Sequence, residues 1–204
     1  MRLKTPIRWP LPVAGLLAAM MLQGCGPHVA PAAQAPAPAA SAEPPLKLVA
    51  SIQDIMATMV DPSADALWAS VGSTVTAEGA KDNQPRTDAE WLAARHEALV
   101  LAEAPNLLVT PGRAVAEAGR PVEDAQVPGI LSAAEIQKKI EADPAAFAHH
   151  ARALQDAGLA ALAAVEAKNP VALLDAGEKI DGACEACHLK YWYPNSPKPK
   201  APPS

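Results

Sequence analysis

The sequence predicts an all-α protein: an antiparallel up-down-up-down four-helix bundle whose long helix 2–3 connection contains a short extra helix. Three observations support this prediction. Hydrophobic residues make up 50% of the chain but aromatic residues only 3%, so small side chains such as alanine dominate. Apolar residues recur at three- and four-residue spacing, the period of an amphipathic helix. Residues that favour helix N-termini precede most of these segments. We see no strand pattern and expect no sheet.

Changes in composition predict how the 204 residues are organised. Residues 1–24 resemble a lipoprotein signal peptide, with a basic start and an apolar stretch of about a dozen residues. The stretch ends in "LQGC", which resembles the lipobox of bacterial lipoproteins, so Cys25 is expected to carry lipid. The alternative is an ordinary signal peptide cleaved nearby, which leaves Cys25 as an unmodified thiol. A Pro/Ala-rich tether (25–45), a folded domain (46–194) and a disordered tail (195–204) follow.

The first two helices of the domain are predicted from periodicity and capping residues. The first covers about Leu46–Val71, and Asp61-Pro62 is expected to kink it or to restart it with Asp61 as a cap. Its apolar stripe is Leu48, Ile52, Met56 and Met59. The second begins at the capping box Thr87-x-x-Glu90 and continues to about Leu108.

The remaining helices also begin at recognisable caps. The third opens with Asp143-Pro144, and its stripe includes Gly158, which allows a neighbouring helix to approach closely. The fourth opens with Asn169-Pro170 and ends near Trp192. A short helix is expected over Ser132–Ala142, because Ser132-x-x-Glu135 is another capping box.

The fourth helix carries the motif that bears chemistry. Cys184-Glu185-Ala186-Cys187-His188 fits C-x-x-C-H, the attachment motif of c-type haem. Helix positions i, i+3 and i+4 share a face, so Cys184, Cys187 and His188 fall on one side. Two sulfurs there can form thioethers to the haem vinyl groups while the imidazole reaches the iron. The motif therefore predicts one covalently attached haem c.

The two cysteines have three alternative interpretations besides haem attachment. A structural disulfide is disfavoured, because a helical C-x-x-C is poorly placed for an unstrained bridge. A thioredoxin-like redox pair usually opens a helix in a βαβ unit, and no sheet is expected. A zinc site would need a fourth ligand, and no third cysteine is available once Cys25 is lipidated.

The second axial ligand of the iron is expected to be a methionine. Beyond the signal peptide the chain has only Met56 and Met59, both in the first helix. In the predicted topology the end of the fourth helix meets the start of the first, which brings Met56 to within one or two turns of the level of His188. Met56 is the first choice, and Met59, almost a turn deeper, is the second. Either could instead be a core filler, and His149 or His150 could give a bis-His site.

Several stretches also resemble a known family. The first helix contains M-x-x-x-x-x-P-x-A-D-x-x-W, and the segments "NLLVTPGRA" and "CHLKYWYP" follow later. With C-x-x-C-H near the C-terminus, the chain resembles the cytochrome c-prime superfamily of monohaem four-helix bundles, in its Met/His-ligated, low-spin branch. The resemblance covers about Leu46–Pro194. It implies a covalent haem, His188 as the proximal ligand and Met56 as the distal ligand.

The expected function is one-electron transfer through a His/Met-ligated haem, without enzymatic activity. The partner would be a redox protein of the bacterial cell envelope, and a homodimer is a further option. The protein would lie on the periplasmic side, held to a membrane only by its lipid, with the outer membrane slightly favoured. A formal charge of −5 argues against nucleic-acid binding. The alternatives are a protein that binds nitric oxide or carbon monoxide at an open sixth site, and a haem-based redox sensor.

The long connection over 110–142 carries two candidate ligands for the haem propionates. Arg113 and Arg120 have guanidinium groups that suit carboxylates in a bidentate way. We expect the connection to cover the haem edge, and Arg113 to matter more because it closely follows the second helix. The alternative is a solvent loop whose arginines contact nothing.

Overall fold

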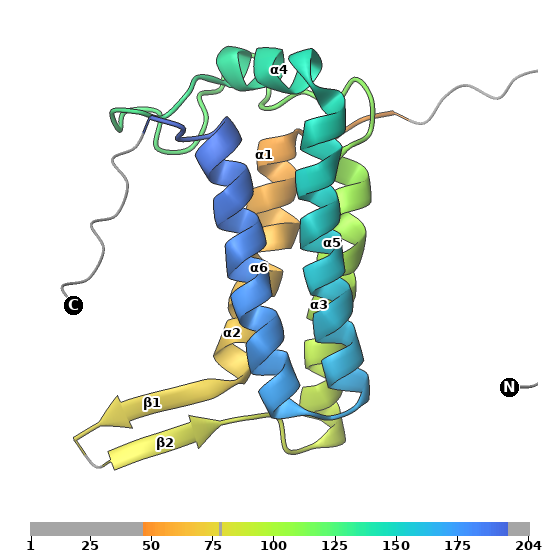
Figure 1. Ribbon diagram of the computed structural model, residues 1–204, viewed down its shortest axis with the longest axis vertical. Helices are drawn as coiled ribbons and strands as arrows, with labels where there is room; N and C mark the ends of the chain where they lie inside the picture. Colours follow the sequence, from red (N-terminus) through yellow and green to blue (C-terminus); the bar gives the residue numbers. More distant parts are fainter. Residues whose placement is uncertain (1–46, 78, 196–204) are drawn as a thin grey trace, which may run out of the picture. The chain divides into compact units, whose positions relative to one another are not determined.

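The computed structural model describes residues 47–77 and 79–195, and these fall within one compact unit, Pro45–Ser204. They are mostly helical and include one two-stranded antiparallel sheet, so the expectation of no strands was wrong (Figure 1). Cys25, the expected signal peptide and tether, and residues 196–204 of the tail lie outside the described residues. In the part of the chain that the structure describes, no helix has both the length and the apolarity needed to cross a membrane.

The first helical stretch is continuous but has three parts: α1 (Ile52–Ile55), the π-helical turn η1 (Met56–Val60) and α2 (Asp61–Ser70). It begins later than predicted, because Ser51 forms a capping box with Asp54. Asp61 remains in helical conformation, and its N–H donates to the carbonyl of Met56, five residues back. Proline lacks an N–H and crowds the preceding turn. We infer that the wider π turn accommodates Pro62, so the helix continues through this residue and does not restart with Asp61 as its cap.

The sheet is the hairpin β1 (Gly72–Thr76) and β2 (Gly79–Asn83), paired from Gly72↔Asn83 to Thr76↔Gly79. Every residue of β2 is exposed, so its sequence lacks the apolar alternation by which half-buried strands are recognised. The hairpin lies at the end of the long helices opposite α4 (Figure 1).

The other helices begin where the sequence predicts. They are α3 (Asp88–Leu108), α4 (Ala133–Ala142), α5 (Pro144–Glu166) and α6 (Pro170–Tyr191). The predicted caps are confirmed, because each side chain accepts a hydrogen bond from a backbone N–H in the first turn of its helix; they are Thr87, Ser132, Asp143 and Asn169.

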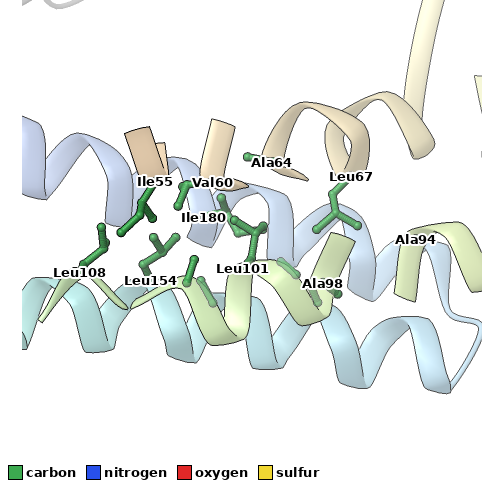
Figure 2. Packing of buried hydrophobic residues seen from close by; sticks show 14 of the residues in the cluster. Ile55, Val60, Ala64, Leu67, Ala94, Ala98, Leu101, Leu108, Leu154 and Ile180 are labelled. Atoms are coloured by element: carbon green, nitrogen blue, oxygen red, sulfur yellow. The ribbon is translucent and has the colours of Figure 1, made fainter. Parts of the chain in front are cut away.

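The long helices pack side by side along their length. α3 contacts α5, α5 contacts α6, and α2 contacts both α3 and α6. Successive segments alternate in direction (Figure 1). The apolar side chains between them are fully buried (Figure 2); the largest are Ile55, Val60, Leu67, Leu101, Leu173 and Ile180. The close approach predicted at Gly158 is confirmed, since a Cβ there would lie 2.8 Å from the backbone nitrogen of Ala102.

The connection between α3 and α5 lies with α4 at the end where α3 finishes and α5 begins (Figure 1). It is packed against the helices. Val115 and Val122 are buried with the core, as is Ile136 of α4. The N–H groups of Ile52 and Gln53 donate to the carbonyls of Ala114 and Val115. The start of α1 is therefore tied to the connection, and the alternative of a solvent loop without contacts was wrong.

Candidate functional site

Cys187 and His188 line a pocket at the end of the molecule covered by α4 and the connection. The pocket contains about 690 Å³ of space, including the part open to solvent. Its walls are largely apolar, with Val115 and Val122 from the connection, Ile136 and Ile140 from α4, and Phe147 from α5.

A second pocket adjoins the first and is lined by Cys184, the remaining residue of the motif. It contains about 390 Å³ and shares Met56, Cys187 and His188 with the first pocket. His150 also lines it. All three residues of C-x-x-C-H thus border the same pair of pockets, as the helical spacing predicts. Both cysteines are free thiols, so they do not form the disulfide weighed as an alternative.

The two methionines of the first helical stretch have different surroundings. Met56 lines both pockets together with His188, whereas Met59 lines neither of them. Met59 is half-buried and packs against the hydrophobic core. Of the two candidate ligands, the structure therefore brings only Met56 to the same pockets as His188.

Burial sets the protonation of the motif. It lowers the pKa of His188, which favours the neutral imidazole that binds metals. Burial also raises the pKa of Cys184 to about 11 and that of Cys187 to about 12. Both thiols therefore keep their protons at neutral pH. A thioredoxin-like redox pair would instead need a low-pKa, reactive thiolate.

The candidate histidines separate in the same way as the methionines. His150 lines the second pocket, and burial lowers its pKa, with Lys190 and His149 contributing. His149 lines neither of the two pockets. If a bis-His site formed, His150 would therefore be the candidate from α5.

Arg113 and Arg120 line neither pocket. Arg113 is buried, and its Nε–H and Nη1–H donate to the backbone carbonyls of Leu107 and Ala50, at 2.6 and 2.5 Å. Arg120 is half-exposed and forms ion pairs with Asp54 at 3.5 Å and with Glu117 at 3.6 Å. In this structure Arg113 ties the end of α3 to the residues before α1.

Two buried polar atoms beside the first pocket lack partners among the described residues. They are the hydroxyl of Tyr191 and the Oε1 of Gln53, and both residues line the pocket. Buried polar groups are normally hydrogen-bonded, so such orphans need an explanation. No sequence motif marks Tyr191, although its position three residues after His188 and seven after Cys184 places it on the same helix face.

Trp192 lines the first pocket and contacts both His188 and the connection. Its indole N–H donates to the carbonyl of Glu123 at 3.3 Å, and its carbonyl accepts from the N–H of Leu131 at 2.8 Å. Its ring meets the His188 imidazole edge-on, with centroids 5.0 Å apart. These contacts hold the connection against the end of α6.

The residues present fit a haem. Two thiols, an imidazole and a thioether line two adjoining pockets whose walls are largely apolar. Two buried polar atoms of residues that line the first pocket have no hydrogen-bond partner among the described residues. The zinc alternative has less support, because within residues 47–77 and 79–195 no three His, Cys, Asp or Glu side chains are grouped as metal ligands. Searches against family models, curated proteins and solved structures found no match to this chain.

Proposed function

We propose that this protein is a monohaem c-type cytochrome that transfers single electrons, built as an up-down-up-down four-helix bundle of the cytochrome c-prime superfamily. One observation carries the proposal: Cys187 and His188 line the same two adjoining pockets as Met56, and Cys184 lines the second of them. The shared location of Cys184, Cys187 and His188 follows from their spacing along one helix. Met56 is far from this motif in the sequence, near the start of the domain. Its presence in the same pockets as His188 supports a pair of axial ligands and not an isolated motif.

Each of these residues has a specific task in the proposed site. Cys184 and Cys187 would hold the haem through thioethers, while His188 and Met56 would supply the axial nitrogen and sulfur. When bound, the haem supplies a one-electron iron couple whose potential is raised by a thioether ligand. The apolar side chains of α4, α5 and the connection would exclude water. Burial keeps the His188 imidazole neutral and ready to ligate.

The proposed cellular setting follows from the sequence pattern before the domain. A lipid on Cys25 and the Pro/Ala-rich segment after it would hold the haem domain at the periplasmic side of a membrane. The partner would be another redox protein of the cell envelope. We propose electron transfer rather than enzymatic turnover, because an iron ligated by both His188 and Met56 would have no open position for a substrate.

Gas binding is a second candidate function, because the second pocket borders both Met56 and His188. If the thioether left the iron, nitric oxide or carbon monoxide could occupy that space. The absorption spectrum of the oxidised protein distinguishes the two functions. A low-spin Met/His spectrum favours electron transfer, and a high-spin or water-bound spectrum favours gas binding.

The test of the proposed function is covalent haem. The chain should be produced in a bacterium with a c-type haem maturation system and then treated with acid–acetone. We expect the haem to stay on the polypeptide, and the double variant Cys184→Ala, Cys187→Ala to release or lack it. Met59→Ala, outside both pockets, is the matched control and should keep covalent haem. Pigment that extracts from the wild type would refute the proposal.

A further inference from the structure

A haem brings two carboxylates to its site, and this pocket has no cationic side chain with which to meet them. The charged residues that line the first pocket are Asp61 and Glu123, both acidic. Arg113 uses two of its donors on backbone carbonyls, and Arg120 is paired with Asp54 and Glu117. A propionate within this pocket would therefore need neutral hydrogen-bond donors.

The Tyr191 hydroxyl has the properties of such a donor. Tyr191 is 4% exposed, and its hydroxyl is buried without a partner among the described residues. Its ring is held edge-on by Phe147, with centroids 5.3 Å apart, and by His150, with centroids 5.8 Å apart. Burial raises the pKa of Tyr191, so the hydroxyl keeps its proton. The side chain is thus fixed by packing while its polar end is unpaired.

Gln53 is the second residue of the same pocket with an unpaired buried atom, its Oε1. The oxygen and nitrogen ends of an amide have nearly the same shape, so its orientation follows from the hydrogen bonds on offer. If the side-chain amide of Gln53 were flipped, its Nε2 group would take the place of the unpaired Oε1 and would present two N–H donors there. Its backbone is fixed by the bond from its N–H to the Val115 carbonyl.

Building on the proposed haem site, we propose that the Tyr191 hydroxyl donates a hydrogen bond to a haem propionate and that the Gln53 amide is the second donor. The site would then recognise the cofactor's carboxylate through neutral groups instead of the arginines that the sequence suggested.

The test compares holoprotein variants by resonance Raman spectroscopy of the propionate bending mode. Tyr191→Phe removes the hydroxyl but keeps the ring between Phe147 and His150, and Gln53→Leu removes the amide. We expect the band to shift in Tyr191→Phe, and the midpoint potential to fall, because a propionate without its donor favours the oxidised iron. Tyr193→Phe is the matched control, since that hydroxyl donates to Glu185 and lines neither pocket.

The chain has only two tyrosines, so the control variant allows a second measurement. In Tyr193→Phe any tyrosine band in the infrared redox-difference spectrum belongs to Tyr191. We expect that band to respond to haem reduction, even if Tyr191→Phe fails to fold. Covalent haem together with an unchanged propionate band in Tyr191→Phe, or with a silent Tyr191 band, overturns this proposal alone. Absence of covalent haem from the wild type overturns the proposed function as well.

Discussion

Met56 and Met59 have the same side chain and lie within one helical turn of each other, but their surroundings differ. Both belong to the π-helical turn η1, in which Met56 is the first residue. Met56 borders the pockets of His188, and Met59 packs against the core. π turns recur at functional sites because the extra residue changes which side chains share a face. The position of Met56 is therefore coupled to the backbone geometry ahead of Pro62.

The two methionines should respond oppositely to truncation. Met56→Ala removes the proposed axial sulfur, so we expect the near-infrared sulfur-to-iron charge-transfer band of the oxidised protein to vanish. The iron should become high-spin or water-bound and should bind carbon monoxide when reduced. Met59→Ala should keep the band and lose stability. Because Met59 is only partly buried, the loss should be below the about 2–5 kcal/mol of a buried methionine.

Absorption spectroscopy and urea unfolding of both variants check this expectation. A band that survives in Met56→Ala but disappears in Met59→Ala would make Met59 the ligand. A band that survives in both would direct attention to His150, which lines the second pocket.

At the scale of helices, the contact between α3 and α5 depends on a residue without a side chain. A Cβ at Gly158 would lie 2.8 Å from both the nitrogen of Ala102 and the carbonyl carbon of Leu101. These are backbone atoms of a packed helix, so they cannot turn aside as a flexible side chain would. Gly182 offers a contrast, because it also lies within a helix and a Cβ there would meet nothing within 4 Å.

Gly158→Ala and Gly182→Ala should therefore change stability in opposite directions. We expect Gly158→Ala to lower the free energy of unfolding by about 1–3 kcal/mol, the usual cost of overpacking. Gly182→Ala should raise it by up to about 1 kcal/mol, since alanine favours a helix interior over glycine. Urea unfolding followed by circular dichroism measures both. Equal destabilisation by the two substitutions would show that helix packing at Gly158 is not the cause.

At the scale of the whole molecule, the pocket is assembled from segments far apart in the chain. Gln53 comes from α1, Val122 from the connection, Ile136 from α4 and Tyr191 from the end of α6. The connection forms part of the pocket wall. It contributes the apolar side chains of Val115 and Val122 and the acidic Glu123, whereas its two arginines line neither pocket.

The attachment of this domain to a membrane is a prediction at the same scale, and it comes from the sequence pattern around Cys25. With Cys25→Ala, the cell fraction that holds the protein should change from membrane to soluble periplasm, while the spectrum of the proposed haem stays the same. Fractionation and haem staining measure this. Mass spectrometry that found a mature N-terminus elsewhere, without lipid, would contradict the anchor.

The sequence by itself determined the features that depend on residues close together in the chain. The caps at Thr87, Ser132, Asp143 and Asn169 each join a side chain to a backbone N–H three residues later, so the pattern alone located the helix starts. The shared face of Cys184, Cys187 and His188 follows from helical spacing in the same way. The exposed hairpin was missed because periodicity reports burial, and β2 is not buried.

Tertiary structure decided the features that require contacts between distant segments. Met56 and not Met59 borders the pockets of His188, and this difference depends on how the first helical stretch packs in the fold. The sequence left Arg113 available for a propionate, but packing directs two of its N–H donors to the carbonyls of Leu107 and Ala50. The unpaired hydroxyl of Tyr191 became visible only when its neighbours were in place. Which polar groups find partners is settled when the chain packs, because some partners, such as the Ala50 carbonyl for Arg113, lie tens of residues away in the sequence.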